Sequence, residues 1–390
     1  MLAFASQSAE NGSMNVNEPL QLLGGLTPAT FMRRHWQKKP LVIRQAIPQF
    51  QAPVGRQELL DLAAMDDVES RLVVQAQPGT HKPWRFRQGP FARKALPPFK
   101  QAGWSLLVQG VDLHDERVHA LMNQFRFVPD ARLDDLMVSY ASDGGGVGPH
   151  FDSYDVFLLQ AHGRRRWRIG RQKDLSLQPD MPLKILANFE PEEEFVLEPG
   201  DMLYLPPRYA HDGVAEGECM TYSIGFRAPA KGELAREVLQ RMAEQAVDEV
   251  GSALYRDPQQ TALEHSGEIP DAMVAFAQKA LEEALRDPLA LRRALGEYLS
   301  EPKANVWFDE GEAAAAPGHV RLDRRTRMLY DQHHIFLNGE SFRASGRDAQ
   351  LMRRLADARE LTATEYKRLG ADAQDLLADW CAAGWMYVDA

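Results

Sequence analysis

From Trp104 to Phe226 the chain is a series of short β-rich segments, and this pattern limits its possible folds more than any other feature. The segments are rich in β-branched and aromatic residues, with Gly, Pro and Asp between them. Strands this short and this close along the chain are typical of antiparallel barrels and jelly rolls. They read WSLLVQGV, LMVSYAS, DVFLLQA, RRRWRIG, EFVLEPGDMLYLP and MTYSIGF. We therefore predict an antiparallel barrel or jelly roll here.

The segments before this region mix helix signals with Pro-rich connections. Thr27 and Pro28 stand where an N-cap and a first helical residue are expected, and a strand is predicted over 41–43. At 390 residues the chain exceeds the usual size of one hydrophobic core, so we expect two or three domains.

After Gly232 the apolar residues recur at helical spacing. Helices are predicted over 233–250 and 271–286, and a third begins at Pro288. Their apolar stripes suit self-association, and they suit packing on the barrel equally well.

The last part of the chain predicts two short strands, three helices and a final strand, which suggests a small winged-helix-like module. The strands are expected at 319–323 and 327–338, and the helices near 346–357, 363–369 and 371–383. We predict three domains, with boundaries at 1–228, 229–302 and 303–390.

Composition and charge exclude several functional classes. The net charge of −10 argues against broad nucleic-acid affinity, and residues 301–390 carry 12 Lys and Arg against 15 Asp and Glu. No segment has the apolar length of a transmembrane helix, and the N-terminus lacks the basic start of a signal peptide. The two cysteines, Cys219 and Cys381, are too few for a disulfide framework and are expected in the core. We therefore expect a cytoplasmic protein.

The segment GPHFDSYD, residues 148–155, places His150 and Asp152 two residues apart at the start of an apolar run. In a strand such residues point to the same face. A carboxylate beside a buried run is costly to desolvate unless a cation pairs with it. This motif by itself is equally consistent with a barrel-rim histidine and a turn aspartate.

A second motif, EPGDMLYLPPRYAHDG, ends in His211, 59 residues after Asp152. The PGD turn is expected to start a strand over 202–205, and a barrel can return His211 to the position of His150 and Asp152. Two histidines and one carboxylate make the facial triad of non-haem Fe(II) oxygenases, with positions left for substrate and O2. Catalytic zinc on the same ligands remains an alternative.

If the arginine run GRRRWRIG is a strand, its side chains point alternately to its two faces. Arg165 shares a face with Trp167 and Ile169, while Arg164, Arg166 and Arg168 share the other. The preceding strand, ending in QAHG, is expected to turn straight back into this one, with His162 at the hairpin tip. An arginine among core-facing residues needs an anion, and its planar fork suits a carboxylate. A dicarboxylate such as 2-oxoglutarate would fit between the metal and Arg165; the alternative is a row of solvated arginines on an edge strand.

Two other motifs carry less weight. DGGGVGP lacks the G-K-[ST] ending of a phosphate loop, and its glycines are expected to let a substrate backbone approach closely. His333 and His334 are adjacent and therefore face opposite ways in a strand, so we interpret them as structural.

Taken together, DGGGVGPHFDSYDVFLLQAHGRRRWRIG, LEPGDMLYLPPRYAHDG and YSIGFRAP resemble the JmjC ribosomal oxygenases of bacteria. The resemblance covers nearly the whole chain. It implies a double-stranded β-helix (a JmjC cupin jelly roll), then a helical dimerisation segment and a winged-helix-like C-terminal domain. It also implies a homodimer. A winged helix suggests DNA binding by analogy, but the net charge of −3 over residues 301–390 opposes that function, so we expect no direct DNA binding.

The resemblance further implies an Fe(II)/2-oxoglutarate-dependent enzyme that uses O2 to hydroxylate an arginine β-carbon in a large-subunit ribosomal protein, the sixteenth. By position, His150, Asp152 and His211 would bind Fe(II), and Arg165 would hold the distal carboxylate of 2-oxoglutarate. Asp143 matches a position that contacts the substrate guanidinium, although an aspartate opening a tight glycine turn is equally expected. Ser139 is expected to line the pocket.

Two alternatives remain open from the sequence. One is a non-enzymatic cupin with a winged helix that acts as a ligand-sensing regulator. The other is a JmjC hydroxylase or demethylase that acts on a different residue.

Overall fold

The computed structural model describes residues 14–76, 84–311, 318–343 and 345–389. The expectation about a signal peptide concerns residues 1–13 above all, which lie outside this set. The chain divides into two compact units, Met1–Ala228 with Ala304–Trp307, and Pro229–Lys303 with Phe308–Ala390.

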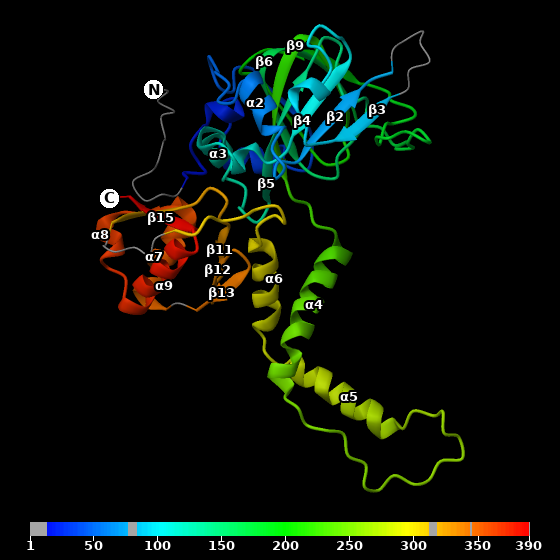
Figure 1. Ribbon diagram of the computed structural model, residues 1–390, viewed down its shortest axis with the longest axis vertical. Coiled ribbons are helices and arrows are strands. Elements are labelled where there is room, and N and C mark those ends of the chain that lie inside the picture. The colour runs from blue at the N-terminus through cyan, green and yellow to red at the C-terminus, as the bar shows by residue number, and fades with distance from the viewer. Residues whose placement is uncertain (1–13, 77–83, 312–317, 344, 390) are drawn as a thin grey trace. The chain divides into compact units, whose positions relative to one another are not determined.

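The first unit is built on an antiparallel sheet of nine strands among the described residues (Figure 1). The strand order is β1-β8-β6-β9-β5-β4-β2-β3, and β7 pairs with β6 beside this path. The strands are β1 Leu41–Ile43, β2 Ser70–Val74, β3 Arg85–Gln88, β4 Trp104–Val108, β5 Leu133–Ala141, β6 Val156–Gly170, β7 Glu193–Leu197, β8 Met202–Leu205 and β9 Ala210–Phe226. This β-rich region confirms the sequence prediction.

Short helices contribute side chains to the larger core of this unit. Phe31 and Leu59 from two helices, and Val118 from a third, lie in one buried cluster with Phe157 and Tyr222 of the sheet. The helices are η1 Gln21–Leu23, α1 Pro28–Arg34, α2 Arg56–Leu62, η2 Arg93–Ala95, η3 Val111–Leu113 and α3 Glu116–Asn123. The start of α1 is as predicted, because Thr27 accepts a hydrogen bond from the N–H of Thr30 and Pro28 is the first helical residue.

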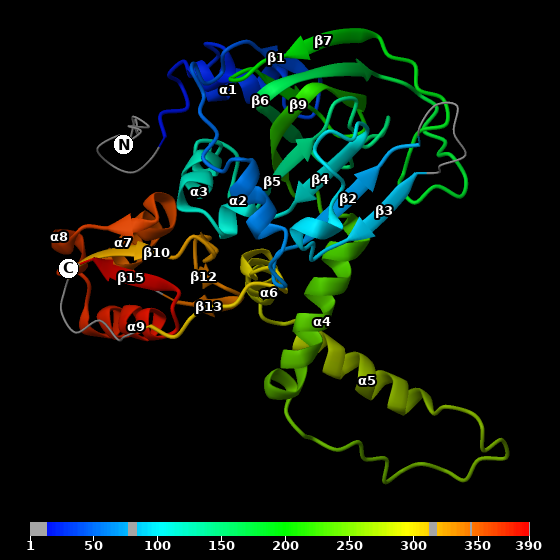
Figure 2. The same cartoon turned by 45° about the horizontal axis from the view of Figure 1, so that its top comes forward.

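Strands β6 and β9 are long and pair with each other over most of their length, which corrects the predicted hairpin at His162 (Figure 2). The register shifts on both sides of His162, and Gly163 has a φ of 61°. These irregularities mark bulges, which bend a strand without reversing it. The turn signal in QAHG therefore produces a bend inside one strand.

The bulges also change which residues face the second core of this unit. Before the bulges the side chains of β6 in this core are the even-numbered Val156 and Leu158. After the bulges they are the odd-numbered Trp167 and Ile169. An extra residue in a strand moves the following side chains to the opposite face. Both halves of β6 thus contribute to one interior.

The PGD turn before β8 is held by its buried carboxylate. Asp201 accepts hydrogen bonds from the N–H groups of Gln45 and Glu198 and pairs with Arg44 at 2.6 Å. Gly200 has a φ of 91°, and a Cβ there would lie 2.5 Å from the carbonyl oxygen of Ile47. The turn therefore requires glycine and ties β8 to the segment after β1.

The second unit begins with the predicted helices. They are α4 Lys231–Val250, α5 Asp271–Ala284 and α6 Ala290–Ser300. α6 also packs on the small sheet that follows: Gly296 lies against Phe336, so closely that a Cβ would be 2.2 Å from Cζ of that ring.

The rest of this unit contains the predicted strands and helices in their predicted order, with one strand divided in two and two further short strands, at 340–342 and 360–361, that the sequence did not predict. The expected strand 327–338 is two strands, because Asp331 accepts hydrogen bonds from the N–H groups of His333 and His334 and forms a turn. The elements are β10 His319–Leu322, β11 Met328–Tyr330, β12 Ile335–Leu337, β13 Glu340–Phe342, α7 Gly346–Ala358, β14 Glu360–Leu361, α8 Ala363–Tyr366, α9 Ala371–Ala382 and β15 Met386–Asp389.

Smaller expectations are met in part. His334 is buried and His333 is exposed, but both lie in the turn at Asp331 and not in a strand as expected. Cys219 and Cys381 are free and buried. Within the described part of the chain, none of the helices combines the length and apolarity needed to cross a bilayer. The three-domain division stays a prediction.

Candidate functional site

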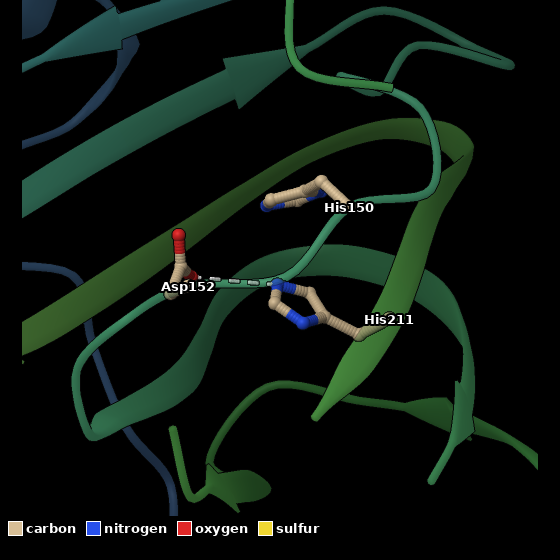
Figure 3. A group of neighbouring side chains, drawn as sticks. All are labelled: His150, Asp152 and His211. Atoms are coloured by element: carbon tan, nitrogen blue, oxygen red, sulfur yellow. Dashed lines mark ion pairs between the residues drawn. The ribbon is translucent and has the colours of Figure 1, made fainter. Parts of the chain in front are cut away.

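His150, Asp152 and His211 meet at one point, as the two sequence motifs predict (Figure 3). Each offers one ligand atom, and these atoms all lie within 4.8 Å of one another. The two imidazole rings are 4.2 Å apart between centroids, and Nε2 of His211 is 3.7 Å from Oδ2 of Asp152. Among the described residues this is the one such cluster of three or more His, Cys, Asp or Glu side chains.

Backbone hydrogen bonds bring these distant segments together. The N–H of His150 donates to the carbonyl of His211 at 2.9 Å, and the N–H of His211 donates back at 2.8 Å. One step further along, the N–H of Arg208 donates to the carbonyl of Asp152 at 2.7 Å. The ligand geometry therefore rests on backbone pairing as well as on side-chain packing.

Both imidazoles are oriented by a carbonyl of their own segment. Nδ1 of His150 lies 2.9 Å from the carbonyl oxygen of Gly148, and Nδ1 of His211 lies 2.9 Å from that of Tyr209. A carbonyl oxygen can only accept, so each neutral ring carries its proton on Nδ1 and leaves the Nε2 lone pair for a metal.

The electrostatics favour the metal-binding form of His211. This side chain is buried, and burial, followed by the charge of His150, lowers the pKa of its imidazole below the ordinary value. A neutral imidazole is the form that coordinates a metal ion.

Arg165 is buried at 7% exposure, whereas the arginines on the other face of β6 are paired. Arg164 and Arg166 pair with Glu216, and Arg168 with Asp212. This confirms the predicted parity and excludes a solvated row that includes Arg165. No acceptor among the described residues lies within hydrogen-bonding distance of its Nε or Nη2. A buried guanidinium in this state is suited to pair with an anion.

These residues fit the metal and the dicarboxylate. Two imidazole nitrogens and one carboxylate oxygen occupy part of a coordination sphere and leave the rest to other ligands. The two buried N–H donors of Arg165 match the fork of a carboxylate.

The two residues expected near the substrate have other contacts in the structure. Asp143 is exposed, and its Oδ1 accepts a hydrogen bond from the N–H of Gly217 at 2.8 Å, which is the turn role. Ser139 is buried on β5 and donates to the carbonyl of Thr221 at 3.3 Å. Their contact with substrate stays a prediction.

The glycines after Asp143 allow other backbone segments of this chain to approach closely. A Cβ on Gly145 would lie 2.4 Å from the carbonyl oxygen of Trp104, and one on Gly146 would lie 2.5 Å from that of Gly213. The close approach expected for a substrate is thus made by the protein itself at these two positions.

One pair of site residues was not singled out from the sequence. Trp167 is buried on the same face of β6 as Arg165, and its ring centroid is 5.9 Å from that of His211. Gly213 lies against the indole, where a Cβ would be 2.7 Å from Cζ3 and Cη2. The signal available was the alternation R-x-W-x-I, which already placed Trp167 beside Arg165.

The sequence matches two known domain families. Residues 120–234 match the JmjC domain and residues 283–387 match the ROXA-like winged helix. The first match contains all three residues of the cluster and Arg165. The second confirms the winged-helix prediction.

Similar proteins are known in bacteria. The ribosomal protein uL16 3-hydroxylase of Escherichia coli (strain K12) is 37% identical over 337 residues, which cover 82% of this chain and 86% of that protein. A probable ribosomal oxygenase of Haemophilus influenzae is 30% identical over 403 residues, 93% of this chain and 96% of that protein.

Solved structures of E. coli YcfD are also similar to this chain. The X-ray structure of E. coli YcfD is 32% identical and has a TM-score of 0.77, covering 93% of this chain and 98% of that one. A structure of YcfD, a ribosomal oxygenase, in complex with cobalt and 2-oxoglutarate has a TM-score of 0.75 at 32% identity, with coverage of 94% and 99%. The predicted jelly roll and winged helix are confirmed, and the chain belongs to the bacterial JmjC ribosomal oxygenases.

Proposed function

We propose that this chain is an Fe(II)- and 2-oxoglutarate-dependent hydroxylase that acts on an arginine β-carbon of a large-subunit ribosomal protein. The name of the E. coli relative, ribosomal protein uL16 3-hydroxylase, supports the substrate and the reaction. The cobalt and 2-oxoglutarate in the YcfD complex support the metal and the cosubstrate.

In this proposal His150, Asp152 and His211 hold Fe(II). The convergence of their ligand atoms supports the assignment, as do the two Nδ1 contacts that leave both Nε2 atoms available. With the metal bound, 2-oxoglutarate and O2 are converted to succinate and CO2 while one oxygen atom enters a substrate C–H bond. The protein binds and orients the reactants and keeps bulk water away.

Arg165 binds the distal carboxylate of 2-oxoglutarate, and its burial is the observation that carries the proposal. The guanidinium is on the interior face of β6, and Nε and Nη2 have no acceptor among the described residues. A dicarboxylate that chelates the metal at one end supplies such an acceptor at the other.

The substrate arginine is proposed to meet an acidic side chain at Asp143, with Ser139 lining the pocket. Support comes from the exposure of Asp143, since a carboxylate at the surface is available to a cationic side chain. Its hydrogen bond to Gly217 uses Oδ1.

The direct test is turnover of a peptide from the large-subunit ribosomal protein uL16. With Fe(II), 2-oxoglutarate and O2, we expect succinate and a mass gain of one oxygen atom on one arginine. Replacement of that arginine in the peptide by lysine is the matched control and should abolish the mass gain. Oxygen on another residue would overturn the assigned target, and no peptide-dependent succinate would overturn the function.

We also propose that the chain forms a homodimer through residues 229–302. Large apolar side chains are exposed on its helices, which isolated monomers rarely tolerate in number. They include Leu239, Val247, Met273, Val274, Phe276, Leu281 and Leu291. Sedimentation should show a dimer that Leu281→Glu dissociates and Gln278→Glu, on the same helix, leaves intact. A wild-type monomer would contradict the proposal.

The winged-helix-like region is proposed not to bind DNA directly, because acidic residues outnumber basic ones over 301–390. Saturable binding to a duplex at physiological salt would contradict this. A ribosomal-protein substrate also supports a cytoplasmic location, which fractionation of cells would test.

A further inference from the structure

Trp167 presents a buried hydrogen-bond donor that the fold itself does not use. The residue is 4% exposed, and no acceptor among the described residues lies within hydrogen-bonding distance of its indole Nε1. Trp104, in the same unit, is also buried but donates its indole N–H to the carbonyl of Pro98 at 3.3 Å. An indole N–H that is buried without a partner is unfavourable, because it has lost its hydrogen bond to water and gained none in the protein.

The position of Trp167 connects the two ends of the proposed site. On β6 it stands between Arg165 and Ile169, and Ile169 is the register partner of His211. The guanidinium carbon of Arg165 is 5.8 Å from the indole centroid, and the His211 ring is 5.9 Å from it. A molecule that reaches from the metal ligands to Arg165 passes beside this ring.

The orientation of the indole is set by its contact with β9. The ring atoms Cε3, Cζ3 and Cη2 lie nearest to Gly213, the register partner of Trp167, where a Cβ would come within 2.7–3.0 Å. Nε1 is not among the indole atoms nearest to Gly213. The absence of a side chain at Gly213 is what allows this placement.

Three buried donors without acceptors therefore belong to one strand face: Nε and Nη2 of Arg165 and Nε1 of Trp167. Several buried N–H groups on one face, with one formal positive charge among them, suit a carboxylate better than any neutral group. We propose that the indole N–H of Trp167 donates a hydrogen bond to the distal carboxylate of 2-oxoglutarate, beside Arg165. This inference rests on the proposed function and adds a binding residue to it.

The test uses Mn(II)-loaded full-length protein, so that binding is measured without turnover. Calorimetry should show that Trp167→Phe weakens 2-oxoglutarate binding about tenfold, the effect of losing one hydrogen bond to a charged group. Binding of 2-oxopentanoate, in which a methyl group replaces the distal carboxylate, should be the same in both proteins. Trp104→Phe makes the same chemical change at an indole that already has a partner and should leave both affinities unchanged.

A second measurement does not require a variant. In Zn(II)-loaded wild type labelled with 15N, the Trp167 indole resonance, assigned through its backbone, should shift downfield on addition of 2-oxoglutarate. It should not make this shift with 2-oxopentanoate.

The outcomes separate the inference from the function it rests on. If wild type binds 2-oxoglutarate and Trp167→Phe binds it as tightly, the inference is overturned and the function stands. Equal weakening of 2-oxoglutarate and 2-oxopentanoate would also overturn it, because the effect would then be structural. If wild type binds no 2-oxoglutarate, the proposed function itself fails.

Discussion

Two backbone hydrogen bonds join His150 and His211. The N–H of His150 donates to the carbonyl of His211 at 2.9 Å, and the N–H of His211 donates to the carbonyl of His150 at 2.8 Å. The pair forms an isolated antiparallel bridge outside the continuous ladders. Side chains on paired residues of two antiparallel segments lie on the same side. The bridge therefore places two imidazoles on one face before any metal binds.

Removal of one ligand should abolish tight metal binding. We expect His150→Ala to weaken Co(II) affinity by at least about 100-fold, because only two of the three protein ligands remain to hold the metal. The exposed His162 provides the matched control, since His162→Ala removes a histidine outside the cluster. Titration followed by the Co(II) absorption spectrum measures both, and comparable losses would contradict the assigned ligand set.

Lysine should not replace Arg165. Its single ammonium cannot reproduce the planar fork, so Arg165→Lys should weaken 2-oxoglutarate binding about 10- to 100-fold. Arg164→Lys, the same change one residue earlier on the outward face, should alter it less than about twofold, as expected for an exposed ion pair. The Michaelis constant for 2-oxoglutarate in both variants tests this, and an unchanged value for Arg165→Lys would refute the anion role.

Asp143 should matter for the peptide and not for the cosubstrate. Asp143→Asn retains an oxygen for the Gly217 N–H but removes the charge. We expect peptide-dependent turnover to fall about tenfold while slow turnover of 2-oxoglutarate without peptide is unchanged. If both fall equally, the aspartate serves the turn alone.

Alanine at Gly213 should disturb the indole of Trp167. The added Cβ would overlap the ring at 2.7 Å, so we expect the free energy of unfolding to fall by about 1–3 kcal/mol, together with weaker 2-oxoglutarate binding. Gly232, in the first turn of α4, is the control: a Cβ there would meet nothing within 4 Å, so Gly232→Ala should be neutral or slightly stabilising. Chemical unfolding of the two variants compares them directly, and equal stability would contradict the close contact.

Asp201 should make stability depend on acid. Burial alone would raise the pKa of its carboxyl, but the N–H of Gln45, the Arg44 guanidinium and the N–H of Glu198 outweigh it and lower the pKa. The folded carboxyl then releases its proton at a lower pH than the unfolded one. Below about pH 4 the unfolded chain takes up a proton that the folded chain resists, so this stabilisation is present above that pH and is lost as the pH falls.

The variant Asp201→Asn isolates this effect. Near neutral pH it should lower the free energy of unfolding by about 1–3 kcal/mol, and its difference from wild type should shrink toward pH 3. Urea unfolding at both pH values measures the difference, and Asp61→Asn serves as an exposed control. A difference that does not change with pH would show that the loss is not linked to the proton.

Much of the site was predictable from the sequence because the relevant rules are local. Alternation along a strand put Arg165 on the buried face, and the H-x-D spacing put His150 and Asp152 on one side. Thr27 and Pro28 likewise mark the start of α1 without reference to distant residues.

The sequence predictions of strand boundaries were wrong where the local composition competes with hydrogen bonds to other residues. QAHG has the composition of a turn, yet β6 continues through it because β9 pairs with both halves of the strand. Conversely, Asp331 divides a segment with strand-like composition by accepting two backbone hydrogen bonds. Neither outcome follows from propensity alone.

The amino-acid sequence by itself determined the chemistry available to this protein: which side chains can bind a metal, and which arginine is turned away from water. Only the tertiary structure decided that His211 returns to His150 and that the bulges in β6 point Arg165 and Trp167 into the same interior as Val156. The physical reason is that pairing between strands joins residues distant in the chain, and one additional residue in a strand reverses the face of every side chain after it.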